Sequence, residues 1–92
     1  MNRIRVAVLV EGQVQGVGFR YFTKSTAQAL ELTGWVRNRI DGSVEAVLEG
    51  SKEAVNAALD DLRQGPAGGH VEKLHCEQQP YRGEFESFEV RF

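Results

Sequence analysis

Near its middle, the sequence places Asp41-Gly42 between two alternating apolar stretches, WVRNRI (35–40) and SVEAVLEG (43–50). Both turn residues tolerate a positive φ, so this pattern predicts two strands joined in a β-hairpin. A strand and a helix are expected before the hairpin, and a helix and a strand after it. The hairpin therefore joins two split βαβ units, and both helices have to pack on one sheet.

The spacing of apolar residues predicts the remaining elements. They are strands at 4–11, 71–78 and 87–92, and helices at 21–32 and 52–64. Right-handed crossovers then favour an α+β fold of the ferredoxin-like βαββαβ type. In this sandwich an antiparallel sheet carries two helices on one face and a short extra C-terminal strand. We expect the 92 residues, 1–92, to form a single domain.

Composition and charge exclude several classes of protein. The net charge is only −2, which is not typical of a nucleic-acid binder. The apolar run at 6–10 is too short for a signal peptide or a membrane span, and the lone Cys76 fits a reducing compartment. We therefore expect a cytoplasmic monomer that binds neither nucleic acid nor membrane. Most aromatic side chains are expected in the core rather than stacked on bases.

Charge is distributed unevenly along the chain. Residues 1–40 carry six basic and two acidic side chains, whereas residues 41–92 carry five basic and eleven acidic ones. The positive half contains the glycine-rich stretch EGQVQGVGFRYF (11–22), which lies between a predicted strand and a predicted helix. A glycine-rich turn in a positive region suits a small anionic ligand.

The glycine-rich stretch matches none of the common phosphate-binding signatures. It has no lysine followed by serine or threonine in the P-loop frame, and Tyr21 stands where a dinucleotide fingerprint needs its third glycine. A cysteine-dependent phosphatase has a cysteine six residues before its arginine. Here Val14 stands six residues before Arg20. The loop therefore lacks a nucleophile, and no covalent phosphoenzyme can form on it.

The same stretch can still bind an anion through its backbone. Gly16 and Gly18 permit a positive φ, so the N–H groups from about Gln15 to Arg20 can point into one concavity. The following helix adds its positive N-terminal end, and Arg20 can donate two charge-assisted hydrogen bonds to a phosphate. The alternative is a tight turn whose glycines serve packing and whose Arg20 lies on the surface.

The strand after the first helix places a polar residue on its apolar side. Alternation puts Trp35, Arg37 and Arg39 on one face, and Val36, Asn38 and Ile40 on the other. Val36 and Ile40 are expected to face the helices and the core. The Asn38 amide would then need a partner, because an unpaired buried amide is costly. It could bond to loop backbone or hold a water beside a bound phosphate.

At these places the sequence resembles the acylphosphatase family. The resemblance lies in GQVQGVGFR, GWVRN, DGSVE, QGP and FEVRF, in this order, and covers nearly the whole chain. It implies that Arg20 and Asn38 are catalytic. The substrate phosphate would be bound by the residues at six consecutive positions: Gln15, Gly16, Val17, Gly18, Phe19 and Arg20.

The resemblance also implies a reaction. Family members hydrolyse the carboxyl–phosphate bond of small acyl phosphates and release a carboxylate and inorganic phosphate. Asn38 would orient a water for direct attack on the phosphate, without a metal or other cofactor. Because the chain has 92 residues and ends in FEVRF, we expect a free-standing enzyme. The alternative is a non-catalytic acylphosphatase-like module that binds an anion or a partner protein.

A metal site is the remaining alternative. His70, His75 and Cys76 are metal-ligand residue types, but a fixed-spacing zinc pattern needs more ligands. Cys76 alternates with Leu74 and is expected to be a small core residue. We therefore expect no metal.

Overall fold

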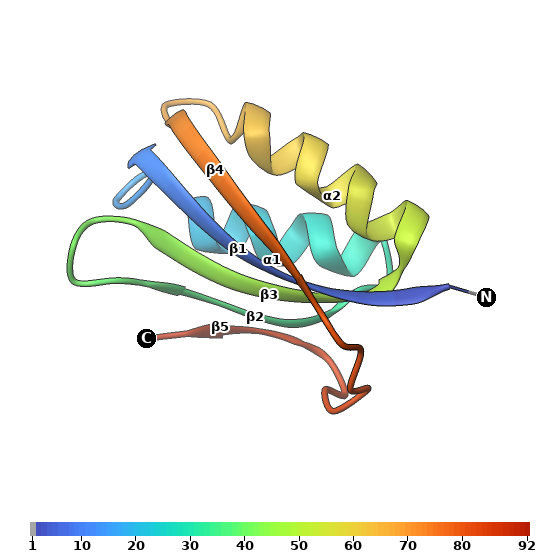
Figure 1. The fold of residues 1–92 in the computed structure, drawn as a ribbon. Coiled ribbons are helices and arrows are strands. Elements are labelled where there is room, and N and C mark those ends of the chain that lie inside the picture. The colour runs from blue at the N-terminus through green and yellow to red at the C-terminus, as the bar shows by residue number, and fades with distance from the viewer. Residues whose placement is uncertain (1) are drawn as a thin grey trace.

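The computed structural model describes residues 2–92 and has two layers, a five-stranded sheet with two helices on one of its faces (Figure 1). The elements are β1 (Arg3–Gln13), α1 (Phe19–Ala29), β2 (Thr33–Asn38), β3 (Val44–Ser51), α2 (Lys52–Gln64), β4 (His70–Gln79) and β5 (Phe88–Arg91). This order confirms the predicted ferredoxin-like sandwich. Within residues 2–92, no helix is both long and apolar enough to cross a membrane.

The strands lie in the order β4-β1-β3-β2-β5. β1 pairs antiparallel with β3 and β4, and β2 pairs antiparallel with β3, as predicted. The extra strand β5 instead runs parallel to β2. The reason is that β4 ends beside the start of β1, and the segment 80–87 crosses this end of the sheet to the far edge (Figure 1). The sheet is therefore mixed.

The core lies between the sheet and the helices. α2 spans the predicted residues and buries an apolar stripe at i, i+3, i+4 and i+7: Val55, Ala58, Leu59 and Leu62. α1 begins at Phe19, two residues before the predicted start, because Phe19 is buried and anchors the first turn. Its end is also earlier than predicted, and Glu31 has a φ of 58°, which is not helical.

The β2–β3 connection is longer than the predicted two-residue turn. β2 ends at Asn38, and the Arg39 N–H donates to the Ser43 carbonyl oxygen at 2.8 Å. Asp41 accepts from the backbone N–H and the hydroxyl of Ser43 at 3.0 and 2.6 Å, which fixes the turn. Val36 is buried as expected, but the expectation for Ile40 was wrong: it lies in the turn and is fully exposed.

The expectation for Cys76 was also wrong. Cys76 is exposed and lies on β4, which is at the edge of the sheet beside β1. Its neighbour Leu74 is half-buried and packs against the core. Partial burial of the sulfur raises the pKa of the Cys76 thiol, and the Arg63 guanidinium partly offsets this effect. The higher pKa makes the thiol less nucleophilic at neutral pH.

A buried ion pair fastens the segment 80–87 to the helix-free face of the sheet. Arg5 on β1 and Glu49 on β3 are both buried, and Arg5 Nη1 lies 3.4 Å from Glu49 Oε2. The same oxygen accepts from the backbone N–H groups of Arg82 and Gly83 at 2.9 and 3.3 Å. Arg5 also bonds to Glu84 at 2.7 Å. Glu49 therefore holds together two strands and the segment that leads to β5.

Replacing Glu49 is expected to destabilise the fold strongly. Glu49→Ala leaves Arg5 and two backbone N–H groups without this partner, which should lower the free energy of unfolding by about 3 kcal/mol. Urea denaturation measures this change. Glu45→Ala is the matched control on the same strand, because it removes only exposed pairs with Arg37 and Arg39 and should cost at most about 1 kcal/mol. Equal losses in the two variants would contradict this role for Glu49.

Candidate active site

The turn between β1 and α1 adopts the backbone conformation that its glycines suggested. Gly16 has a φ of 75°, and Gly18, the N-cap of α1, has a φ of 77°. A Cβ at either position would meet no atom within 4 Å, so the glycines serve the left-handed conformation and not close packing. The Phe22 N–H donates to the Gly18 carbonyl oxygen at 2.9 Å and closes the first turn of α1.

The apolar side chains of this turn pack into the core. Val14 and Phe19, at its two ends, are buried in the core, and Val17 packs against the core between them. The glycine backbone remains on the surface: Gly16 and Gly18 are both exposed. The turn is therefore anchored in the core at both ends, and the peptide groups of its glycines are accessible to a ligand. We call residues 14–18 the cradle.

Gln15 connects the cradle to the β2–β3 connection. Its Nε2 donates to the carbonyl oxygens of Arg39 at 2.7 Å and Ser43 at 2.9 Å. Within residues 2–92, the side-chain hydrogen bonds shown between the cradle and this connection come from Gln15 and not from Asn38. The backbone-bonding role considered for Asn38 is thus taken by Gln15.

A pocket of about 230 Å³ brings the two expected catalytic residues together. Its lining consists of Val14, Gly16, Gly18, Phe19, Arg20, Tyr21 and Asn38. Two further residues that the sequence pointed to, Gln15 and Val17, belong to the cradle but do not line the pocket. Asn38 comes from the end of β2, whereas every other lining residue belongs to the continuous segment 14–21.

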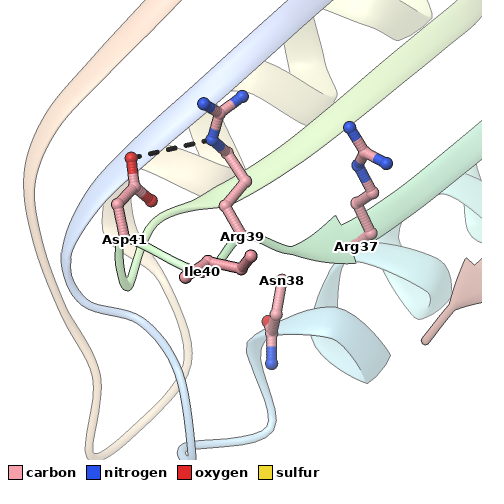
Figure 2. Close-up of a pocket in the computed structure, with 5 residues that line it drawn as sticks. All are labelled: Arg37, Asn38, Arg39, Ile40 and Asp41. Atoms are coloured by element: carbon pink, nitrogen blue, oxygen red, sulfur yellow. Dashed lines mark ion pairs between the residues drawn. The ribbon is translucent and has the colours of Figure 1, made fainter.

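Asn38 points away from the arginines that flank it. Figure 2 shows Arg37 and Arg39 on one side of the chain and Asn38 on the opposite side, toward the segment that leads into α1. This is the alternation that the sequence predicted for β2. Asn38 is half-buried, so its amide is accessible to a small molecule in the pocket.

Arg20 is contacted by the C-terminal end of the chain. Its Nη1 donates to the Arg91 carbonyl oxygen at 3.3 Å, and its guanidinium carbon lies 4.6 Å from the centre of the Phe92 ring. Sequence reasoning missed both contacts. They depend on β5 pairing with β2, and no motif spacing indicates which edge a short terminal strand will join.

The family model described as Acylphosphatase matches residues 6–90. The chain belongs to the acylphosphatase family. An acylphosphatase of Syntrophotalea carbinolica is 54% identical over 92 residues, which cover 100% of both chains. The structure is similar to acylphosphatase from Bacillus subtilis, with a TM-score of 0.94, 31% identity, and 97% and 99% of the two chains covered. It is also similar to an acylphosphatase from Coxiella burnetii, with a TM-score of 0.93 and 34% identity, and with 98% of this chain and 94% of that chain covered.

A second pocket of about 410 Å³ lies next to the cradle in this acylphosphatase fold (Figure 2). It is lined by Arg37, Asn38, Arg39, Ile40 and Asp41. Glu45 lies 2.8 Å from Arg37, and Asp41 lies 3.7 Å from Arg39, so both cations have acidic partners. Hydrogen bonds from Ser43 and the charge of Arg39 lower the pKa of Asp41, which keeps it ionised. This pocket is therefore less suited to a phosphate than the cradle.

The donor groups of the pocket that contains Arg20 and Asn38 suit an anion rather than a metal. Backbone N–H groups, a guanidinium and an amide can donate hydrogen bonds to phosphate oxygens. His75 lies away from the cradle with its Nε2 2.6 Å from Glu11 Oε2. In the described part of the chain, no group of three or more His, Cys, Asp or Glu side chains could hold a metal ion.

The left-handed conformation at the N-cap of α1 gives a direct stability test. Gly18→Ala should lower the free energy of unfolding by about 1–2 kcal/mol, because an L-residue is strained at this φ even where space is free. Chemical denaturation measures the loss. Gln28→Ala, at an exposed position of α1, is the control and should change stability by at most about 0.5 kcal/mol. A Gly18 variant as stable as this control would show that the position tolerates another conformation.

Proposed function

We propose that this chain hydrolyses small acyl phosphates to a carboxylate and inorganic phosphate. The observation that carries the proposal is the single pocket that joins the glycine backbone of the cradle, Arg20 and Asn38. Among residues 2–92, those that line it include no cysteine, serine, histidine or carboxylate. This composition favours direct attack by water over a covalent intermediate.

In the proposed complex the cradle and Arg20 bind the phosphoryl group. The N–H groups from Gln15 to Arg20 and the positive N-terminal end of α1 surround its oxygens. Arg20 adds a positive charge, and its side chain contacts the Arg91 carbonyl oxygen and the Phe92 ring. Donors that are already oriented stabilise the charge of the transition state without reorganisation.

Asn38 would orient the attacking water. The amide can accept a hydrogen bond from the water through its oxygen and donate one to a phosphate oxygen through its nitrogen. The leaving carboxylate has a conjugate acid of pKa about 4, so it departs without a general acid. With no base in the pocket lining, the water's proton passes to an oxygen of the phosphate itself. Positioning and charge stabilisation then account for catalysis, with no metal or other cofactor.

The alternative is a non-catalytic module that binds an anion or a partner through the same cradle. Such a module would need the backbone N–H groups and Arg20 but would not need a water on Asn38. The presence of Asn38 in the pocket lining favours the enzyme. The two functions therefore differ in whether a substitution of Asn38 should affect the protein's activity.

Two substitutions separate binding from turnover. The assays use acetyl or benzoyl phosphate with a chelator present. Arg20→Gln should weaken the binding of the substrate and also the binding of inorganic phosphate, which competes with it. Asn38→Ala should lower kcat by about 10²–10³-fold, because it removes an oriented group, yet still bind phosphate. Steady-state kinetics with phosphate as competitive inhibitor measure both effects.

Arg37→Gln is the matched control for Arg20→Gln, because Arg37 is exposed and points away from Asn38 (Figure 2). It should leave both kcat and phosphate inhibition within about twofold of the parent. Persistent turnover in an Arg20→Gln, Asn38→Ala double variant would overturn the proposed function. Phosphate binding with no turnover in the parent protein would instead favour the non-catalytic module.

A further inference from the structure

We propose that Tyr21 contacts the acyl group of the substrate and makes the site favour acyl phosphates with an aromatic or similarly large planar acyl group. The inference rests on the proposed function, since it assigns the second half of the substrate to the same pocket. Tyr21 lies in the first turn of α1, next to Arg20, and lines the pocket of about 230 Å³.

The direction of the acyl group follows from the geometry of phosphoryl transfer. The attacking and leaving oxygens lie roughly in line through phosphorus. If Asn38 holds the attacking water, the carboxylate leaves on the side of the phosphate remote from Asn38. Every other residue that lines the pocket belongs to the segment 14–21. The acyl group is therefore expected to contact this segment and not β2.

Few side chains of this segment are available to an acyl group. Val14 and Phe19 are only 1% and 2% exposed, so their side chains belong to the core. The glycines have no side chain, and Arg20 is assigned to the phosphate. Tyr21 is 57% exposed and is thus the lining residue that can offer apolar surface to the acyl group.

Ile40 is the competing candidate, because it is fully exposed and lines the neighbouring pocket next to Asn38. That pocket is lined by residues 37–41, at the end of β2 and in the connection that follows (Figure 2). It lies on the side of the site where Asn38 is proposed to hold the attacking water. An acyl group placed there would displace the water that Asn38 is proposed to orient. The in-line requirement therefore favours Tyr21 over Ile40.

An aromatic side chain at this place gives a preference by class of acyl group. The tyrosine ring presents a flat apolar face, against which an aryl group packs with more contact than a methyl group does. The phosphate half of the substrate is the same in both cases, so the preference should come from the acyl half alone. Benzoyl phosphate should consequently depend on Tyr21 much more than acetyl phosphate.

The experiment compares kcat/KM for benzoyl and acetyl phosphate across five proteins: the parent, Tyr21→Ala, Tyr21→Phe, Ile40→Ala and Tyr81→Ala. Tyr81, which is 43% exposed in the segment 80–87, is the matched control for loss of a surface tyrosine. Tyr21→Ala should lower the benzoyl-to-acetyl ratio by about tenfold, mainly through KM. Tyr21→Phe, Ile40→Ala and Tyr81→Ala should keep the ratio within about twofold of the parent.

Binding gives a second readout that does not depend on turnover. The probes are the phosphonate analogues of benzoyl and acetyl phosphate, in which a methylene replaces the bridging oxygen. Calorimetry should show that Tyr21→Ala lowers the affinity for the aryl analogue about tenfold more than the affinity for the methyl analogue. If the parent binds both analogues but has no turnover, the proposed function fails while the assignment of Tyr21 is still tested.

Two results would overturn the inference. An equal loss for both substrates and both analogues in Tyr21→Ala would mean that Tyr21 supports the cradle and not the acyl group. A selective loss for the aryl compounds in Ile40→Ala but not in Tyr21→Ala would place the acyl group in the pocket beside β2.

Discussion

Two hydrogen bonds from the side-chain amide of Gln15 hold the two halves of the candidate site together. The cradle follows β1 and Asn38 ends β2, but β3 lies between these strands, so strand pairing does not join the two directly. Gln15 Nε2 spans this gap by donating to the Arg39 and Ser43 carbonyl oxygens at 2.7 and 2.9 Å. The pairing of Val10 and Asn38 with Val44 on β3 brings the ends of β1 and β2 near each other, and the Gln15 side chain then ties the cradle to the connection that follows Asn38. A site that acts by positioning depends on such a contact.

The rest of the site is fixed by the core and by the far edge of the sheet. Val14 at the start of the cradle and Phe19 directly after it are both buried, whereas the glycines between them lie at the surface. The edge strand β5 then brings the Arg91 carbonyl oxygen and the Phe92 ring to Arg20. At the opposite end of the sheet, Glu49 fixes the segment that leads into β5. The contacts of Arg20 with Arg91 and Phe92 therefore depend on the pairing of β5 with β2.

Local signals in the sequence were sufficient to predict most of the fold. The stripe of α2, the hairpin and the left-handed glycines were predicted, because each follows from the conformational preferences of adjacent residues. Ile40 was wrongly expected to be buried because the turn is longer than its Asp-Gly pair suggests. Cys76 was wrongly expected to be buried because the alternation of residues does not reveal that β4 is an edge strand. The roles of Gln15 and Arg91 depend on residues distant in sequence, and no spacing rule supplies them. Arg20 and Asn38 were singled out from the glycine-rich stretch and the strand alternation, their catalytic roles came from the family resemblance, and both line one pocket.

The central claim is that the cradle presents phosphorus, and not the carbonyl carbon, to a water. Hydrolysis of acetyl phosphate in water enriched in oxygen-18 tests this most directly. The mass of each product reports which bond was broken, since attack at phosphorus breaks the bond between phosphorus and the bridging oxygen. We expect one labelled oxygen in each inorganic phosphate and none in the acetate. Label in the acetate, with unlabelled phosphate, would show attack at the carbonyl carbon and would contradict the assignment of Asn38 and the cradle.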